Sequence, residues 1–308
     1  MDVIRGHLHA PPWAAAAIAI GNFDGVHRGH RALIERTREL ARAHQARAVA
    51  LTFHPHPGAV LTTKAAPPML TSLERRLELL ADAGLDAVVV EPFTQELAGL
   101  SASAFVDSVL IGALGARAII VGYDFSYGAG RIGTTETLRA HGNRAGIEVD
   151  VLPQVEVGGE IASSTRVRGY LREGDLAGAG RLLARPWDVD GVVIHGAKRG
   201  REIGVPTANI QPDTELLIAP GIYAVTLSVE GGPPLPAVAS LGTNPTFVQQ
   251  GGLVLEVHVL DWAGDLYDKR VRTTFVARLR EERTYPSVDT LLVQIRQDIV
   301  DARAALRR

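Results

Sequence analysis

The 308-residue chain contains no cysteine, which excludes disulfides, thiolate zinc sites, iron–sulfur clusters and cysteine nucleophiles. Any chemistry must therefore use other polar side chains or the backbone. We expect a cytoplasmic protein, because a chain without cysteine is compatible with a reducing compartment. Hydrophobic residues make up 46% of the chain and charged residues 21%, so a disordered or fibrous protein is not expected.

The chain also lacks an excess of charge of one sign. It has 32 Lys and Arg against 34 Asp and Glu, for a net charge of −2. This balance offers no electrostatic basis for binding nucleic acid or an anionic membrane, so we expect neither as a partner. The longest early apolar run, residues 13–20, is too short to span a bilayer and fits a buried strand better than a signal peptide.

The first half of the sequence alternates short apolar runs with amphipathic stretches. Predicted strands are 14–20, 47–53, 87–90, 118–121 and 147–152, and predicted helices are 28–43, 72–83, 103–114 and 135–141. Apolar strands without strict alternation, separated by helices, are typical of a parallel doubly wound sheet. We therefore expect an α/β fold in this half.

The pattern changes after a helical stretch at 163–184. Predicted strands are then 189–195, 223–229, 235–240, 253–260 and 271–277, followed by an amphipathic helix from 287 to about 303. Turns rich in glycine and proline between these strands favour an antiparallel barrel. The length suits two domains, and we place them at 1–185 and 186–308.

A glycine-rich segment with two histidines, residues 21–30, follows the first predicted strand and opens the first helix. Ligands bind at this carboxyl edge of parallel sheets, and free N–H groups at a helix start favour phosphate. His27 and His30 are three residues apart, so both can face one ligand and donate hydrogen bonds to developing charge. A helix cap with surface histidines is the alternative. The residues predicted to bind ATP here are Gly21, Asn22, Phe23, Asp24, His27 and His30.

Three further segments are predicted to lie at the same edge. His56, within residues 52–57, is either a substrate contact or part of a proline-stiffened turn. Asp124 and Phe125 follow the fourth predicted strand and suit base or flavin recognition, unless the aromatic ring packs in the core. Hydroxyls and an arginine at a helix start suit ATP phosphates, with an ordinary helix cap as the alternative. These residues are Ser164, Thr165 and Arg168.

A second candidate site begins with a glycine-rich basic loop that could also be a solvated turn. Its predicted ATP-binding residues are Gly196, Lys198, Gly200, Gly204, Thr207 and Asn209. Thr207 and Asn209 alternate, so in an extended segment their side chains point the same way. Their oxygens suit Mg²⁺ carried by ATP phosphates. Glu256 lies in an apolar predicted strand, and alternation places its side chain on the face opposite to those of Leu253, Leu255 and Val257. It is either merely exposed on that face or functional.

These motifs occur in the order found in the prokaryotic bifunctional riboflavin kinase/FAD synthetases, and the chain resembles that family over nearly its whole length. The resemblance rests on 21–30, Thr-Phe-x-Pro-His-Pro at 52–57, Gly-Tyr-Asp-Phe at 122–125, Ser-Ser-Thr-Arg-Val-Arg at 163–168, Gly-Arg-Glu-Ile-Gly-Val-Pro-Thr-Ala-Asn at 200–209, Gly-Ile-Tyr-Ala-Val at 221–225, Gly-x-x-Pro-Thr-Phe at 242–247, Glu-Val-His at 256–258, Asp-Leu-Tyr at 265–267 and Leu-Arg-x-Glu at 279–282. It implies a Rossmann-like nucleotidylyltransferase domain followed by a riboflavin kinase barrel with a terminal helix. His54 departs from the family, which has an acidic residue there, as do Tyr127 and Tyr285, where phenylalanine is usual.

The resemblance implies two reactions on small-molecule substrates. The C-terminal domain would phosphorylate riboflavin with ATP to give FMN, and the N-terminal domain would adenylylate FMN with a second ATP to give FAD. Glu256 is then the general base of the kinase, with Mg²⁺ held by Thr207 and Asn209. Arg280 is the flavin-contacting arginine by position, with a surface ion pair as the alternative. Two rival hypotheses are a nucleotidylyltransferase for another acceptor with a non-catalytic barrel, and a non-catalytic flavin-binding module.

Overall fold

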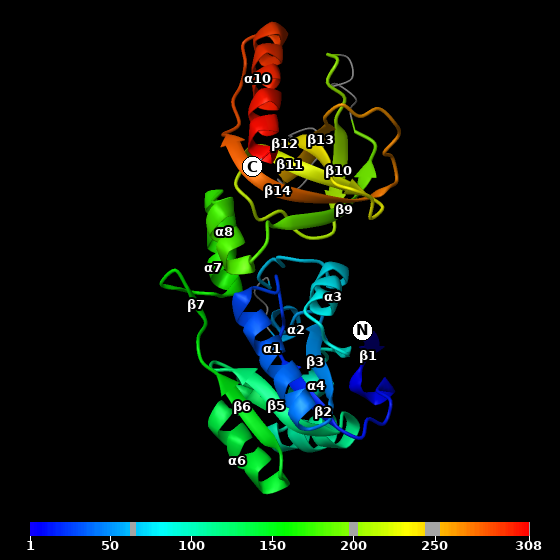
Figure 1. The fold of residues 1–308 in the computed structure, drawn as a ribbon, viewed down its shortest axis with the longest axis vertical. Coiled ribbons are helices and arrows are strands. Elements are labelled where there is room, and N and C mark those ends of the chain that lie inside the picture. The colour runs from blue at the N-terminus through cyan, green and yellow to red at the C-terminus, as the bar shows by residue number, and fades with distance from the viewer. Residues whose placement is uncertain (62–65, 197–202, 244–252, 308) are drawn as a thin grey trace. The chain divides into compact units, whose positions relative to one another are not determined.

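The computed structural model describes residues 1–61, 66–196, 203–243 and 253–307 (Figure 1). The chain folds into two compact units. The first comprises residues 1–67 and 73–163, and the second residues 68–72 and 164–308. Residues 164–185 thus pack with the barrel, although the sequence predicts that they belong to the N-terminal domain. The boundary near residue 186 stays a prediction.

The first unit is built on a six-stranded, fully parallel sheet, which confirms the predicted α/β class. Its strands are β1 (Asp2–Arg5), β2 (Ala16–Ile20), β3 (Arg47–His54), β4 (Ala87–Pro92), β5 (Ala116–Gly122) and β6 (Glu148–Leu152), in the order β1-β4-β3-β2-β5-β6. The edge strand β1 is additional to the five predicted strands. Because β2, β3 and β5 are parallel neighbours, their carboxyl ends share one edge of the sheet.

Helices accompany the sheet in the first unit, and two small strands follow β6. They are η1 (His7–His9), α1 (Arg28–Ala43), α2 (Pro57–Leu61), α3 (Leu73–Asp82), α4 (Gln95–Gly99), α5 (Ala102–Ala104), η2 (Phe105–Ala113), η3 (Ala129–Arg131), α6 (Thr135–Ala145), β7 (Glu156–Val157) and β8 (Glu160–Ile161). The predicted helix at 103–114 is in fact short α5 followed by η2, a π-helix, so its turns are wider than expected.

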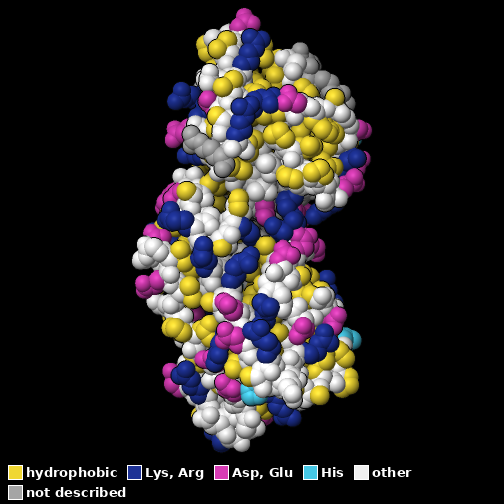
Figure 2. Space-filling model, viewed as in Figure 1, with side chains coloured by type: hydrophobic (Ala, Val, Ile, Leu, Met, Phe, Trp, Pro, Cys, Tyr) yellow, Lys and Arg dark blue, Asp and Glu magenta, His cyan; other side chains and the backbone are white. Residues whose placement is uncertain are grey.

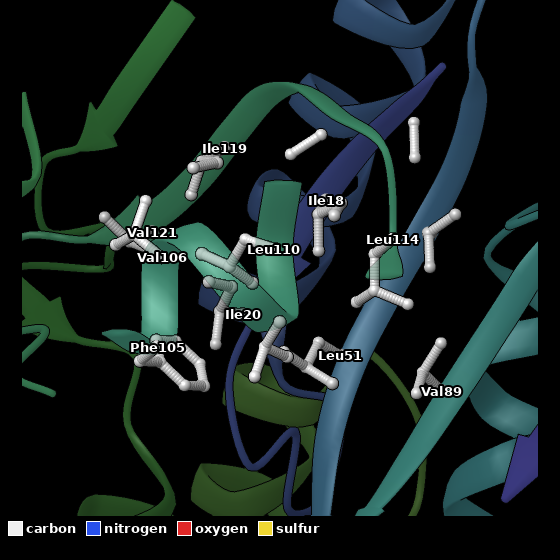
Figure 3. Close-up of a cluster of buried hydrophobic side chains, with 14 of the residues drawn as sticks. Ile18, Ile20, Leu51, Val89, Phe105, Val106, Leu110, Leu114, Ile119 and Val121 are labelled. Atoms are coloured by element: carbon white, nitrogen blue, oxygen red, sulfur yellow. The ribbon is translucent and has the colours of Figure 1, made fainter. Parts of the chain in front are cut away.

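The strands of this sheet are buried on both faces, which explains their continuous apolar sequence. In β2, Ile18 and Ile20 belong to one hydrophobic cluster, while Ala17 and Ala19 belong to another. Figure 3 shows the first cluster, with Leu110 and its neighbours from η2 beside the strands. Each fully buried leucine or isoleucine contributes about 1.5–3 kcal/mol, so the two clusters fix the sheet that carries the loops.

The second unit begins with two helices rather than one. α7 (Ser164–Glu173) and α8 (Leu176–Leu183) are separated at Gly174, whose φ of +77° ends the first helix. Asp175 then caps α8, because its carboxylate accepts a hydrogen bond from the Gly178 N–H at 2.8 Å. The predicted helical stretch at 163–184 is therefore two consecutive helices.

The rest of this unit is a closed antiparallel barrel with a terminal helix, as predicted. The strands are β9 (Asp188–Ile194), β10 (Ala208–Pro212), β11 (Gly221–Val229), β12 (Leu235–Thr243), β13 (Leu253–Val259) and β14 (Arg270–Arg280), closing in the order β10-β13-β12-β11-β14-β9. Strand β10 is additional to the five predicted. Helix α10 (Val288–Leu306) packs against β11, β12 and β14 and starts with a Ser287–Thr290 capping box.

The surface carries both signs of charge. Figure 2 shows Lys and Arg interspersed with Asp and Glu over the face in view, in keeping with the net charge of −2. Within the described part of the chain, none of the helices has the length and apolar character needed to cross a bilayer.

Candidate active sites

The loop between β2 and α1 carries the first candidate site, and its backbone is strained. Phe23, Gly25 and Val26 have φ values of +50°, +80° and +43°, and such values are costly for residues other than glycine. The loop is anchored at the Asn22 carbonyl, which accepts hydrogen bonds from Thr52 Oγ1 at 3.2 Å and Arg76 Nη1 at 2.5 Å. A strained loop held by buried donors is typical of a functional site.

Asn22 and His56, predicted from separate motifs, lie together at this edge. The Asn22 side-chain amide is 3.1 Å from His56 Nε2, and the Gly58 N–H donates to His56 Nδ1 at 3.0 Å. The ring of His56 is thus held in place at the carboxyl end of β3, next to the loop that follows β2. The contact favours a role for His56 in the site over that of a turn residue alone.

His27 and His30 form a stacked pair at the start of α1. Their ring centroids are 3.7 Å apart at an interplanar angle of 22°, and Phe23 lies against His30 at 5.3 Å. His27 is only 6% exposed, so the alternative of two surface histidines does not hold. Burial lowers the pKa of His30 well below its usual value, and repulsion from His27 and Arg76 lowers it further. His30 is therefore neutral at pH 7 and can donate one N–H to a phosphate oxygen.

The other residues predicted for adenylyl transfer lie at two places. Asp124 and Phe125 follow β5 at the same sheet edge; Asp124 is exposed, whereas Phe125 stacks on Tyr127 at 5.5 Å and packs against the core. Ser164, Thr165 and Arg168 occupy the first turns of α7 in the second unit, where Arg168 Nε donates to the Pro68 carbonyl at 2.8 Å. Their ATP-binding roles stay predictions.

The barrel brings Thr207, Asn209 and Glu256 together, although Glu256 is 47 residues or more along the chain from the other two. Asn209 on β10 is the register partner of Glu256 on β13, so their side chains leave the same face of the barrel. Thr207 Oγ1 donates to Glu256 Oε2 at 3.4 Å. A Cβ at Gly196 would overlap the Asn209 side chain, so only glycine allows this approach. Glu256 is half-buried beside Thr207 and Asn209, so the alternative that Glu256 is merely exposed does not hold.

The pair formed by Asn209 and Glu256 belongs to a row of register partners that continues across neighbouring strands of the barrel. Glu256 pairs with Ser240 on β12, Ser240 pairs with Ile222 on β11, and Ile222 pairs with Arg280 on β14. Neighbouring strands are about 4.8 Å apart, so Arg280 stands about 14 Å from Glu256 along one row. Ser240 was not predicted from the sequence, because its position in this row follows from the strand register.

Arg280 is held by a buried ion pair with the terminal helix. Its Nε and NH2 donate to the two carboxylate oxygens of Asp298 at 2.8 and 2.7 Å, and Gln294 also donates to Asp298. The side chains of Arg280 and Asp298 are only 14% and 5% exposed. The alternative of a surface ion pair is correct in that Arg280 forms an ion pair, but the pair is buried and not at the surface. Such a pair fixes the direction of the guanidinium.

A cavity of about 290 Å³ lies beside Thr207 in the barrel unit. Its lining residues are Val193, Pro206, Thr207, Ala208, Val257, Val259, Trp262, Ala263, Gly264, Asp265, Leu266 and Tyr267. Tyr267, one of the lining residues, stacks on His195 with ring centroids 4.0 Å apart. Thr207 thus touches both Glu256 and this cavity. Gly204 has a φ of +78°, whereas Lys198 and Gly200 lie outside the described residues.

The donor set around Thr207 and Asn209 suits a cation shared with a phosphate ligand. Among the described residues, no three His, Cys, Asp or Glu side chains converge as a metal site. Thr207 and Asn209 instead offer one hydroxyl and one amide oxygen next to the Glu256 carboxylate. Neutral oxygen donors near one carboxylate are suited to Mg²⁺, which retains waters and binds substrate phosphates.

The two halves of the chain match two protein families. Residues 10–166 match the FAD synthetase family and residues 183–306 match the riboflavin kinase family. A bifunctional riboflavin kinase/FMN adenylyltransferase from Pseudomonas fluorescens is 39% identical over 305 residues, which cover 99% of this chain and 97% of the relative. The protein of the same name from Escherichia coli K12 is 38% identical over 308 residues, covering 98% and 97%.

The fold also has a counterpart of known structure. A crystal structure described as a macrolide-efflux protein from Streptococcus pneumoniae superposes with a TM-score of 0.88 at 30% identity, covering 98% of this chain and 99% of that one. Both family matches and the full-length relatives agree with the order of the two folds described above. This chain therefore belongs to the family of bifunctional riboflavin kinase/FMN adenylyltransferases.

Proposed function

We infer that this chain makes FMN from riboflavin and FAD from FMN, with ATP as the co-substrate of both reactions. The observation that carries the kinase assignment is the convergence of Thr207, Asn209 and Glu256 on one face of the barrel. The stacked pair of His27 and His30 at a helix start supports adenylyl transfer in the first unit. The family matches place the two activities in the same order along the chain.

Glu256 acts as the general base in the kinase reaction. Its carboxylate accepts the proton of the ribityl 5′-hydroxyl as that oxygen bonds to the γ-phosphorus of ATP, and the bond to the β–γ bridging oxygen breaks to release ADP. The cavity beside Thr207 receives the nucleotide, and Arg280 orients the flavin from the far end of the register row. Thr207 and Asn209 would hold Mg²⁺, which offsets phosphate charge when bound.

Adenylyl transfer in the first unit needs no covalent intermediate. A phosphate oxygen of FMN attacks the α-phosphorus of ATP, and the bond to the α–β bridging oxygen breaks to release pyrophosphate. The chain supplies positioning and charge stabilisation. The neutral His30 and its partner His27 donate hydrogen bonds to the ATP phosphates, and the Asn22 side chain lies at the same edge of the sheet. The Ser-Ser-Thr-Arg motif at the start of α7 also predicts that Ser164, Thr165 and Arg168 bind the triphosphate.

The partners in this proposal are riboflavin, FMN and ATP, without nucleic acid or membrane, and the compartment is the cytoplasm. The macrolide-efflux description of the similar structure is not carried over, because the groups gathered at both sites suit phosphorus transfer. A nucleotidylyltransferase for another acceptor with a non-catalytic barrel is the alternative. Side chains arranged around Glu256 as a kinase site argue against an inert barrel.

The test is to incubate the purified chain with riboflavin, ATP and Mg²⁺ and to separate the flavins by chromatography. We expect FMN to appear first and FAD to follow, with parallel incubations lacking ATP as the control. Supplying FMN in place of riboflavin should give FAD directly. Formation of neither product would refute the proposal, and FAD from FMN without FMN from riboflavin would favour the non-catalytic barrel.

A further inference from the structure

Arg76 on helix α3 is a buried cation that the sequence does not reveal as functional. It is 2% exposed, and its Nε is buried with no hydrogen-bond partner among the described residues. Burying a guanidinium is costly unless its hydrogen bonds and charge are compensated. Burial lowers the pKa of Arg76, and the charges of Asp24 and Glu74 oppose that effect. The burial of this guanidinium is therefore unfavourable unless the hydrogen bond that it donates compensates for the cost.

The contact that Arg76 makes points to the loop of the adenylyltransferase site. Its NH1 donates to the Asn22 carbonyl at 2.5 Å, across 54 residues of sequence. The same carbonyl accepts from Thr52 Oγ1 at 3.2 Å, and Thr52 is fully buried. Two buried side chains from β3 and α3 thus converge on one peptide group of the loop.

That peptide group precedes the strained part of the loop. Phe23 and Val26 hold positive φ values, and the surroundings must stabilise such a backbone. The loop leads directly into His27 and His30, whose stacked rings are fixed relative to Phe23. Anchoring the Asn22 carbonyl therefore fixes the direction in which both imidazoles face a substrate.

The charge of Arg76 also acts within this site. It lies near enough to Asp24, His30 and His54 for Coulombic interaction with each. His54, whose role the sequence left open, is the exposed last residue of β3. Its pKa is lowered by burial first and by Arg76 second.

We propose that Arg76 is a positioning residue for adenylyl transfer: with Thr52, it clamps the Asn22 carbonyl and so sets the geometry of His27 and His30. This inference rests on the proposed function of the first unit. Arg76 acts through the loop and does not itself need to touch the substrate. Its loss should lower the rate of the chemical step, because misplacing catalytic groups by about 1 Å can reduce a rate about 100-fold.

The experiment compares Arg76→Met, Arg76→Lys and Arg75→Met in the full chain. Arg75 is the matched control, because it is on the same helix but pairs with Glu78 at 2.9 Å. With FMN and ATP as substrates, Arg76→Met should lower kcat about 100-fold while KM for both changes little, and Arg76→Lys should recover part of the loss. Arg75→Met should behave as the wild type. Riboflavin phosphorylation by the same preparations should be unchanged, and the thermal unfolding temperature should not fall with the rate.

A merely structural role predicts a different result. In that case Arg76→Met would lower the unfolding temperature and the amount of active enzyme, and the folded remainder would keep the wild-type kcat, which would overturn the proposal. If Arg76→Met cannot be purified folded, Thr52→Val carries the test, since it removes the other donor to the same carbonyl. It should lower the same kcat by about fivefold, as expected for one hydrogen bond, and an unchanged kcat would overturn the proposal.

Failure of this inference is distinguishable from failure of the proposed function. If the wild-type chain makes no FAD from FMN, the proposed function itself fails. If the wild type makes FAD and Arg76→Met makes it at the same rate, only the role of Arg76 is refuted.

Discussion

The buried ion pair between Arg280 and Asp298 allows a quantitative test of how the terminal helix supports the kinase. The pair is bidentate, at 2.8 and 2.7 Å, and nearly inaccessible. Asp298→Asn removes the carboxylate charge but keeps the shape and one acceptor. Removing one partner of a buried pair costs about 3–5 kcal/mol, and the remaining acceptor places this change near 3 kcal/mol. At 1.36 kcal/mol per tenfold change, the unfolding equilibrium constant should rise about 160-fold.

The assay is urea unfolding of the barrel unit, combined with riboflavin kinase kinetics. The matched control is Asp301→Asn on the same helix, where Asp301 is exposed and accepts a hydrogen bond from Gln297 at 2.9 Å. Asp298→Asn should raise KM for riboflavin, because Arg280 loses the group that fixes its direction, while FAD formation from supplied FMN should be unchanged. A loss of stability no larger than that of Asp301→Asn, with an unchanged KM, would refute the reasoning.

Three further results are expected. Glu256→Gln keeps the hydrogen bond from Thr207 but removes the base, so riboflavin phosphorylation should fall by about 10²- to 10⁴-fold while adenylylation of FMN persists; equal loss of both would contradict the assignment. Gly196→Ala places a Cβ against the Asn209 side chain and should reduce the kinase rate alone, as a steady-state assay of both reactions would show. Burial holds the pKa of His30 below its usual 6.5, so the unfolded chain binds a proton there before the folded chain does. Stability should therefore fall as the pH drops below about 6.5, and His30→Gln should flatten that fall in thermal unfolding curves.

The parallel sheet and the barrel could be predicted because their central strands are apolar runs between glycine and proline turns. Two strands, β1 and β10, were not predicted, each for a different reason. β1, Asp-Val-Ile-Arg, lies at a sheet edge and is mostly exposed, so it has no apolar run. β10 carries the polar Asn209 and ends in Pro212, so its sequence has the composition of a turn. Its place in the barrel depends on pairing with β9 and β13, which are distant in sequence.

The candidate sites divide in the same way. His27, His30, Thr207 and Asn209 stand in motifs whose local spacing already indicates phosphate chemistry, whereas the role of Glu256 followed only from the resemblance to the family. The supporting residues do not stand in such motifs, because their roles arise from long-range contacts. Arg76 resembles any charged residue of an amphipathic helix until the fold buries it against Asn22, and Asp298 becomes the partner of Arg280 only when α10 packs on the barrel.

The central claim is that one chain performs two reactions at two independent sites. It is tested most directly with Asn209→Ala and His30→Ala, each supplied with riboflavin, ATP and Mg²⁺, alone and mixed in equal amounts. Asn209→Ala alone should leave riboflavin unchanged, His30→Ala alone should accumulate FMN, and the mixture should produce FAD. Loss of both activities in either folded variant, or a mixture that yields no FAD, would contradict the account.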